Sequence, residues 1–407
     1  MIKERQRVTR RDTKGRILQK GEGQDKNGRY YYNYMDINGR RKRIYNTELT
    51  ELRKAERIIQ KSIDNGIDID AGKRTLNEQF EIYLAYKNIK ETTKLQYRGR
   101  WNAHIVKVLG DKKLNNIKKS DIQLFYKKLS DEGLKDTSIK AYSHLLHPLL
   151  ESAVNDDIIR KNPSKGCLKE YNNRPKEREA LTIEQQDMLL DFIRTSKKFN
   201  KYFPFIMFAL ATACRKGEII GITWDDIDMK NRTISINHQL QYISENGKAK
   251  YIVSSPKTET GIRDIPMTEK CYKALVMQKE YQLNNGIDHN LRKAGIGNFV
   301  FTTSSGTPYT PSNVNAFIEN IVRTFNEAQQ NKAIENNSYI QLLPHITCHT
   351  LRHTACTRLA ESNIDIKVLQ RFMGHADIKT TMNIYNHVDY MRMKTEIEKA
   401  ERISRVI

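Results

Sequence analysis

The residues best suited to chemistry in this chain are a histidine, an arginine and a tyrosine near the C-terminus. His349 and Arg352 are three positions apart, a spacing that puts both on one helix face. Gly374-His375 follows, and Tyr385 comes ten residues after that histidine. His and Arg can donate hydrogen bonds to an anion, and a tyrosine oxygen can act as a nucleophile. The set indicates chemistry on a phosphate.

The overall charge points to the same kind of partner. The 407 residues hold 70 Lys+Arg against 48 Asp+Glu, a net charge of +22, which favours a polyanion. The chain has no run of about 18 apolar residues, and Met1 to Arg16 lacks the apolar core of a signal peptide. We therefore expect a cytoplasmic protein that binds nucleic acid, with no membrane partner.

The cysteines give no sign of a disulfide framework or a zinc site. There are five, an odd number, and none forms a Cys-x-x-Cys pair. Reduced thiols are the expected state. At about 100 to 200 residues per domain, the length allows two to four domains.

Residues 1–73 are predicted to form a small basic domain. Residues 29–34 and 40–45 have strand composition, and the turn between them ends in Gly39, where a positive φ is needed. Residues 15–20 are the predicted third strand. Helical spacing runs from Leu49 and ends near Asn65-Gly66. The expected product is a three-stranded sheet backed by one helix.

The basic and aromatic residues of this sheet are candidates for DNA contact, although a solvated basic hairpin has the same composition. The residues predicted to contact DNA here are Arg29, Tyr31, Arg40, Arg41, Lys42 and Arg43.

Residues 74–167 are predicted to be an all-α domain of four helices. Apolar spacing begins at Leu76 and recurs to about residue 162, with a helix start at Ser120 and a proline, Pro148, that should kink or split the last helix. Lysines line the polar positions, where they can follow a phosphate backbone or serve solubility alone. The predicted DNA contacts are Lys118, Lys119 and Lys140. Residues 168–179 are polar and read as a linker.

Residues 180–407 are predicted to form a mainly helical α/β catalytic domain. Thr182 with Gln185 gives a capped helix start, and helices are expected over 203–212 and after Lys216. Residues 233–238, 250–253 and 263–266 are expected as strands of one small antiparallel sheet. The predicted fold class is therefore a multidomain α+β protein.

A second group of candidate residues lies well before the first. Arg215 and Glu218 stand in Ala213-Cys214-Arg215-Lys216-Gly217-Glu218, and Lys257 follows in Ser255-Pro256-Lys257-Thr258. With His349-x-x-Arg352, Gly374-His375 and Thr380-Thr381-Met382-Asn383-Ile384-Tyr385-Asn386-His387-Val388, these residues in this order resemble the tyrosine recombinase, or phage integrase, family. The basic N-terminal segment is similar to the arm-binding domain of integrases of conjugative transposons.

Two residues depart from the family pattern. Ala213 stands where the family usually has glycine, and Lys216 stands where a small or apolar residue is common.

The resemblance implies a set of roles that phosphodiester chemistry supports. Arg215 and Arg352 would clamp the non-bridging oxygens, since arginines stay charged and bind bidentately. Tyr385 would attack phosphorus and form a 3′-phosphotyrosine, and Lys257 would protonate the departing 5′ oxygen.

The remaining candidates support these groups. His349 or solvent would take the tyrosine proton, and His375 would bind the phosphate. Glu218 would orient a neighbour or simply act as a helix-start carboxylate. No acidic cluster accompanies these residues, so we expect no metal and no other cofactor.

The resemblance therefore predicts a bacterial site-specific DNA recombinase that integrates and excises a mobile element through a Holliday junction. It implies a synaptic tetramer on core and arm DNA sites, with a DNA-bending factor and an excisionase as further partners. The tail from Tyr390 to Ile407 is predicted to be a helix that packs on a neighbouring protomer or on its own domain. A type IB topoisomerase and a non-catalytic DNA-binding regulator are the alternatives.

Overall fold

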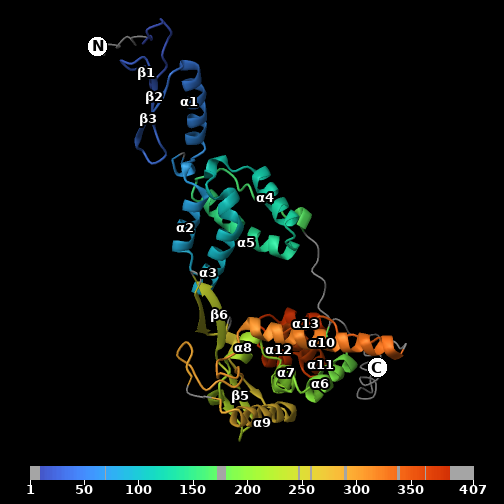
Figure 1. Cartoon of the computed structure of the whole chain (residues 1–407). Coiled ribbons are helices and arrows are strands. Elements are labelled where there is room, and N and C mark those ends of the chain that lie inside the picture. The colour runs from blue at the N-terminus through green and yellow to red at the C-terminus, as the bar shows by residue number, and fades with distance from the viewer. Residues whose placement is uncertain are drawn as a thin grey trace, which may run out of the picture. The chain divides into compact units, whose positions relative to one another are not determined.

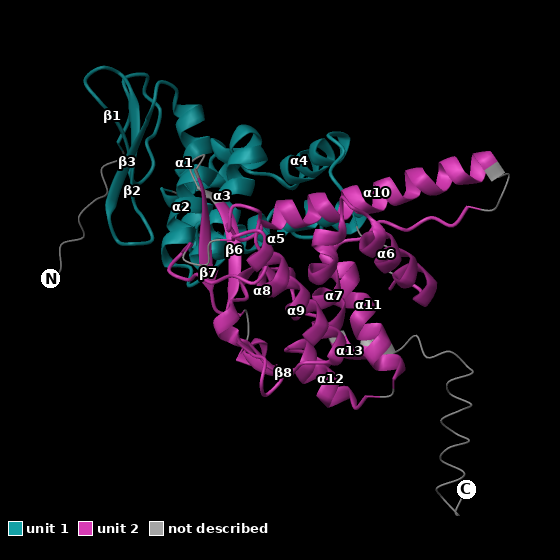
Figure 2. Cartoon of the chain, turned by 60° about the horizontal axis from the view of Figure 1, so that its bottom comes forward, with its two compact units in different colours: residues 1–175 teal, residues 176–407 magenta. Residues whose placement is uncertain are grey.

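The computed structural model describes residues 10–68, 70–171, 180–245, 248–256, 259–287, 291–336, 340–362 and 364–385. The chain divides into two compact units, residues 1–175 and 176–407, which Figure 2 shows in teal and magenta. Each unit has its own buried apolar clusters. This division gives a single boundary, after residue 175. The predicted domain boundaries at residues 73, 167 and 179 therefore stay predictions.

The first unit begins with a three-stranded antiparallel sheet in the order β1-β2-β3, followed by one helix. The elements are β1 (Glu22–Gln24), β2 (Tyr30–Met35), β3 (Arg41–Asn46) and α1 (Leu49–Asp64). One face of the sheet packs Tyr30 and Tyr32 against Leu49 and Leu52 of α1. The helix ends before Gly66, whose φ of +71° suits glycine.

The prediction that residues 15–20 form the third strand was wrong, because that strand is β1. The Asp12 carboxylate accepts the backbone N–H groups of Lys14 and Arg16, and such local bonds compete with sheet pairing. Gly23 of β1 allows the Tyr31 ring to cross the strand, since a Cβ at Gly23 would lie 2.2 Å from Tyr31 Cζ.

The rest of the first unit is helical, as predicted. Its helices are α2 (Leu76–Tyr86), α3 (Glu91–Arg100), which continues as a π-helical segment over Trp101–Gly110, α4 (Lys119–Asp131) and α5 (Asp136–Asn155). In the core, the Trp101 ring stacks on Phe80 with ring centroids 3.8 Å apart. Trp101 Nε1 donates to the side-chain oxygen of Asn77.

Two details of these helices differ from the sequence expectation. The α4 helix is capped at Lys118, whose N–H donates to the Asp121 carboxylate, and not at Ser120. Pro148 does not split α5, because a proline removes one helix bond while buried leucines on either side, such as Leu145 and Leu150, hold both halves in the core.

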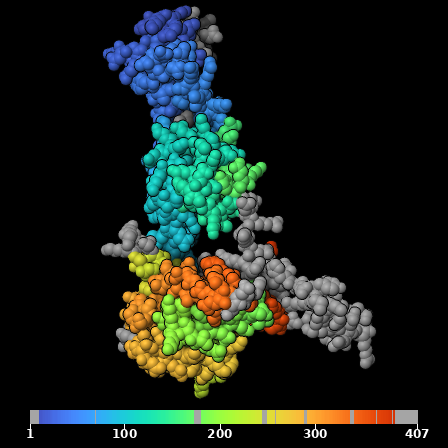
Figure 3. Space-filling view, turned by 45° about the vertical axis from the view of Figure 1, so that its right-hand side comes forward, coloured from blue at the N-terminus to red at the C-terminus, as the bar shows by residue number. Residues whose placement is uncertain are grey.

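The second unit is mainly helical, with strands confined to one region (Figure 1). Its helices are α6 (Ile183–Thr195), α7 (Phe203–Thr212), α8 (Lys216–Gly221), α9 (Glu269–Asn284), α10 (Pro311–Asn336), α11 (Cys348–Glu361), α12 (Ile366–Met373) and α13 (Ile378–Tyr385). The Thr182 cap with Gln185 is present as predicted. In Figure 3 the orange surface of α10 lies against the green surface of α6 and α7. The apolar helix α7 is central to this core.

The prediction of one sheet in this unit was wrong, because the strands form two. Strands β4 (Ile227–Asp228), β5 (Thr233–Ile236) and β8 (Arg263–Pro266) make one sheet in the order β4-β5-β8. Strand β7 (Lys248–Ser254) pairs instead with β6 (Gln239–Glu245), a polar strand that the sequence analysis missed. The mixed α+β fold class is confirmed.

Candidate active site

Four of the predicted catalytic side chains line one pocket of the second unit. The pocket has a volume of about 530 Å³, and its lining residues are Arg215, Lys216, Asn315, Thr347, Cys348, His349, Arg352 and His375. They come from α8 and α11 with their N-cap residues, from α10, and from the second residue after α12, which are far apart in sequence. A pocket this rich in cationic and hydrogen-bonding groups suits an anionic ligand.

Helix α11 presents His349 and Arg352. Thr347 caps the helix by accepting from the Thr350 N–H at 3.2 Å, which fixes where its first turn begins. His349 is exposed, whereas Arg352 is buried and donates to Ala213 O at 2.6 Å and Met373 O at 2.7 Å. Burial and then the charge of Arg215 lower the pKa of Arg352 to about 10, so it remains charged at neutral pH.

Arg215 is held by Glu218 at the start of α8. The Glu218 carboxylate accepts the Arg215 backbone N–H at 2.8 Å and its guanidinium Nη1 at 2.8 Å, while Arg215 Nη2 donates to Gly374 O at 2.6 Å. Glu218 thus makes the contacts of both roles considered for it: it accepts a backbone N–H at the helix start, and it bonds to the side chain of a neighbour, Arg215. Burial opposes ionisation of Glu218, but hydrogen bonds and charge from Arg263 and Arg215 hold its pKa below the usual value.

His375 follows the glycine that ends α12. Gly374 has φ +63°, the left-handed conformation that ends many helices. His375 Nδ1 lies 3.0 Å from Thr381 Oγ1, a contact that orients the ring. Burial, followed by the charges of Arg352 and Arg215, lowers the pKa of His375 to about 4. The ring is therefore neutral at pH 7 and suited to hydrogen bonding.

Two predicted catalytic groups cannot be placed against this pocket. Tyr385 is the last residue of α13, four residues after Thr381, but its side chain lies outside the described residues, as does Lys257. The predicted tail helix from Tyr390 to Ile407 also lies outside them. The structure thus brings together Arg215, Glu218, His349, Arg352 and His375, whose catalytic roles stay predictions.

Sequence reasoning missed one buried cation beside the pocket, Arg263. Its side chain is 2% exposed and bonds to Glu218, so it joins the network behind Arg215. A signal was present, because strand β8 alternates buried and exposed residues, and Arg263 lies on the same inward face as Ile265. A charged residue at an inward position of a short strand indicates a buried partner.

The two departures from the family pattern both lie at this site. Ala213 ends α7 with φ +52°, a conformation that glycine adopts without steric cost. Lys216 turns its ammonium to Asn315 Oδ1 at 3.1 Å and Pro311 O at 3.4 Å, at the N-terminal end of α10. Lys216 thus adds a cation to the pocket wall.

Comparison with known proteins decides the family. Residues 179–392 match the phage integrase family, residues 6–63 match the DNA-binding domain of Tn916 integrase, and residues 75–130 match the SAM-like N-terminal domain of phage integrases. The chain is 32% identical to the transposase from transposon Tn1545 of Streptococcus pneumoniae and to that of Tn916 of Enterococcus faecalis, over 97% of each chain. The chain belongs to the phage integrase family.

Solved structures agree with this membership. The Tn1549 transposon integrase in complex with a circular intermediate DNA has a TM-score of 0.69 and 29% identity, covering 80% of this chain and 99% of that one. A lambda integrase dimer bound to a core site shares the fold, with a TM-score of 0.52 and 19% identity, covering 91% of this chain and 95% of that one. This phage integrase family member is a tyrosine site-specific recombinase of the transposon type that binds DNA.

In this integrase, three of the six predicted arm contacts, Arg29, Tyr31 and Arg43, lie on the face of the N-terminal sheet opposite α1. Strand register places Tyr31 opposite Tyr45 and Asn33 opposite Arg43 on that face. The Arg43 guanidinium lies 4.5 Å from the Tyr31 ring centroid and donates to Asn33 Oδ1 at 2.6 Å. Arg29 lies over the Tyr45 ring at 5.1 Å.

The other predicted arm contacts differ in their surroundings. Arg41 is exposed in β3, and Arg40 is exposed in the turn that precedes it. The Lys42 side chain lies on the other face of the sheet from that of Arg43, and its ammonium pairs with the Asp70 carboxylate at 3.0 Å. The face of the sheet opposite α1, here called the open face, is therefore a better candidate for arm-DNA contact than the whole run of residues 40–43.

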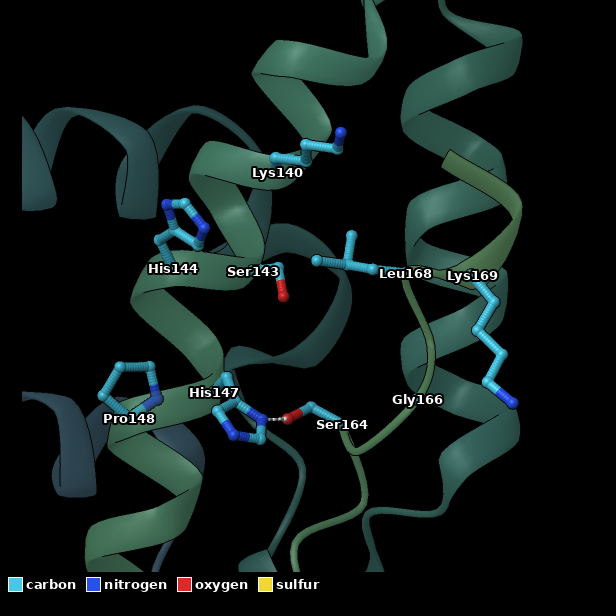
Figure 4. A pocket seen from close by; sticks show the side chains of 9 residues that line it. All are labelled: Lys140, Ser143, His144, His147, Pro148, Ser164, Gly166, Leu168 and Lys169. Atoms are coloured by element: carbon cyan, nitrogen blue, oxygen red, sulfur yellow. Dashed lines mark hydrogen bonds between the residues drawn. The ribbon is translucent and has the colours of Figure 1, made fainter. Parts of the chain in front are cut away.

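The predicted core contacts of the integrase lie on α4 and α5. Lys118 and Lys119 are exposed at the start of α4. Lys140 lines a cavity of about 530 Å³ in which α5 faces the segment that carries Lys169 (Figure 4). In this cavity His147 Nδ1 lies 2.7 Å from Ser164 Oγ, a hydrogen bond between α5 and the segment that follows it.

Within the described ranges, no group of three or more His, Cys, Asp or Glu residues could hold a metal ion. Across the same part of the chain, no helix is both long and apolar enough to cross a membrane. The five cysteines are buried free thiols, as predicted.

Proposed function

We propose that this recombinase cleaves and rejoins DNA at the ends of a mobile element through a 3′-phosphotyrosine on Tyr385, integrating and excising the element through a Holliday junction. The observation that carries the proposal is the pocket in which Arg215, His349, Arg352 and His375 converge. Four residues from three separate parts of the chain, all of types that bind or activate a phosphodiester, meet there beside the helix that ends in Tyr385.

The chemistry follows from what each group can donate. Arg215 and Arg352 bind the non-bridging oxygens, whose charge grows as the tyrosine oxygen attacks phosphorus. The neutral His375, oriented by Thr381, adds a hydrogen bond to the same phosphate. As the bond from phosphorus to the 5′ oxygen breaks, Lys257 gives that oxygen a proton, while His349 or solvent takes the tyrosine proton.

The covalent intermediate conserves the energy of the broken bond. In the reverse step a 5′ hydroxyl attacks the phosphotyrosine, and the tyrosine leaves with its proton restored. No step consumes a nucleotide or needs a metal ion, so none is assigned to the site. Exchange of strands between two duplexes then needs only a change of the attacking 5′ end.

The assembly that this function requires is a tetramer on two duplexes. We assign the core DNA sites to the second unit with α4 and α5, and the arm sites to the open face of the N-terminal sheet. Support comes from the match of residues 6–63 to the DNA-binding domain of Tn916 integrase and from the DNA-bound Tn1549 integrase structures. A DNA-bending factor, an excisionase and a cytoplasmic location belong to the same proposal.

The test is capture of the covalent intermediate. The protein is incubated in EDTA with a nicked suicide duplex that carries the element's end, and adducts are separated on a denaturing gel beside Tyr385→Phe. A wild-type adduct that the variant lacks supports the proposal. No adduct on DNA that the protein binds would favour a non-catalytic regulator, and relaxation of supercoiled DNA without an element end would favour a topoisomerase.

A further inference from the structure

Arg263 occupies an unusual place in the second unit. It is a buried arginine close to the catalytic pocket, but it is not among the residues that line that pocket. Nε donates to Phe372 O at 2.8 Å, Nη1 to Gly261 O at 2.9 Å, and Nη2 to the Glu218 carboxylate at 3.0 Å. All three nitrogens of the guanidinium thus donate to protein groups.

The partners of Arg263 belong to two separate parts of the site. Glu218 is the carboxylate that binds both the backbone N–H and the guanidinium of Arg215. Phe372 is in the last turn of α12, whose end carries Gly374 and His375. Arg263 therefore bridges the group that orients one phosphate-binding arginine and the helix that positions a phosphate-binding histidine.

Three arginines donate hydrogen bonds to three consecutive carbonyl groups at the end of α12. Arg263 donates to Phe372 O, Arg352 to Met373 O and Arg215 to Gly374 O, at 2.8, 2.7 and 2.6 Å. The last carbonyls of a helix have no partner within it, and they carry the negative end of the helix dipole. Each cation therefore gains a hydrogen bond and a favourable charge from the same helix end.

Gly374 makes room for this arrangement. A Cβ built at Gly374 would lie 3.1 Å from Arg263 Cζ and 2.9 Å from its Nη1, and the second distance is shorter than real Cβ contacts. The guanidinium thus packs directly against the backbone of the residue before His375. Glycine is needed there for its positive φ and for the close approach of Arg263.

We propose that Arg263 is a positioning residue for strand cleavage. By bonding to both, it holds the Glu218 carboxylate at a fixed distance and orientation from the α12 end that carries His375. Glu218 in turn holds Arg215. The fork geometry of Arg263 is required, because a lysine ammonium cannot reach the carboxylate and the Phe372 carbonyl in the same planar arrangement. The proposal rests on the phosphotyrosine function, and it adds a residue that acts through its neighbours without touching DNA.

The experiment compares Arg263→Lys with wild type in single-turnover cleavage of the suicide duplex at saturating DNA. A misplacement of about 1 Å in the site can cost on the order of 10²-fold, so we expect a cleavage rate constant about 30- to 100-fold lower with a DNA Kd within about 2-fold. Arg232→Gln is the matched control, because Arg232 makes an exposed ion pair with Glu269 at 2.6 Å. It should cleave like wild type.

A double-mutant cycle separates positioning from general loss of structure. In an Arg215→Lys background the site is already impaired, so Arg263→Lys should lower the rate by less than about 3-fold more. Full additivity, or a single-variant rate within about 2-fold of wild type, would overturn the proposal. Failure of the wild type to form an adduct would instead refute the proposed function.

Gly374→Ala provides a second route if Arg263→Lys does not fold. The added methyl group would displace the Arg263 guanidinium from the α12 end without removing any charge. The variant should therefore also lower the cleavage rate at unchanged DNA Kd. Its effect should not add to that of Arg215→Lys. Normal cleavage by a folded Gly374→Ala protein would contradict the positioning role.

Discussion

Replacement of Glu218 by glutamine should destabilise the second unit more than any surface ion-pair change. Glu218 is 3% exposed and accepts from the Arg215 backbone, from Arg215 Nη1 at 2.8 Å and from Arg263 Nη2 at 3.0 Å. The amide keeps the shape but removes the only negative charge bonded to these two guanidiniums in the described contacts. Arg352, whose pKa is already lowered by burial and then by the charge of Arg215, lies in the same cluster.

The magnitude follows from what remains buried. Removing one partner of a buried ion pair typically costs about 3 to 5 kcal/mol, because the other charge stays without compensation. For a unit of this size, about 1 kcal/mol shifts the melting temperature by roughly 2 to 4 °C, so Glu218→Gln should lower it by roughly 6 to 20 °C. The matched control is Glu361→Gln, since Glu361 forms an exposed pair with Arg358 and should cost at most about 1 kcal/mol.

The assay can report on the second unit alone. The chain has two tryptophans, Trp101 in the first unit and Trp224 in the second. Denaturant unfolding followed by fluorescence in a Trp101→Phe background therefore monitors Trp224. If Glu218→Gln lost no more stability than Glu361→Gln, the ion pairs behind Arg215 would not be the stabilising contacts described above.

The pH dependence of stability has a definite sign for Glu218. Its pKa in the folded protein is lowered, so its stabilising contribution is present above the unfolded value of about 4.5 and is lost as the pH falls through the lower folded value. The glutamine variant lacks this contribution at every pH. Its loss of stability relative to wild type should therefore shrink in acid, which the same fluorescence measurement checks.

Three further predictions concern the pocket and the N-terminal sheet. Lys216→Met should weaken binding of core DNA and reduce the slope of log Kd against log salt concentration by about 1. The Tyr385-dependent adduct should still form. An unchanged slope would show that Lys216 makes no phosphate contact. Arg43→Ala should reduce the salt slope for arm DNA by about 1, and Lys42→Ala, whose lysine pairs with Asp70, should reduce it less; equal effects would argue against the open face. His375 should titrate near pH 4 in NMR of the free protein, and its contribution to stability should decline as the pH falls from about 6.5 towards 4; a midpoint near 6.5 would contradict the buried, cation-flanked ring.

The sequence was sufficient for the parts of the fold that local rules determine. Apolar spacing gave the helices, the Thr182–Gln185 capping pair gave the start of α6, and α7 runs from Phe203 to about where its end was predicted. These features depend on contacts within a few positions. The convergence of Arg215 with Arg352 was expected only through the family resemblance, because no local pattern relates residues that far apart.

The errors arose where pairing between distant segments decides the structure. Strand β6 reads as polar, and only its seven-residue register with β7 shows it as a strand. Strand β1 is three residues long, too short for alternation to be visible, and it depends on β2. Strand identity is context-dependent in this way, since a ladder needs a partner. Arg263 was missed for a related reason: its role depends on Glu218, which is 45 positions away.

The contacts of the two phosphate-binding arginines explain how the site can be organised before DNA arrives. Each guanidinium has five N–H groups, and among the described residues Arg215 and Arg352 each donate two of them to protein acceptors. Up to three on each side chain remain for a phosphate. Because Met373 O and Gly374 O are fixed acceptors at a helix end, the guanidinium planes are set before the substrate binds. A site arranged in this way spends little free energy on reorganisation when charge develops on the phosphate, and such preorganised donors contribute most to stabilising that charge.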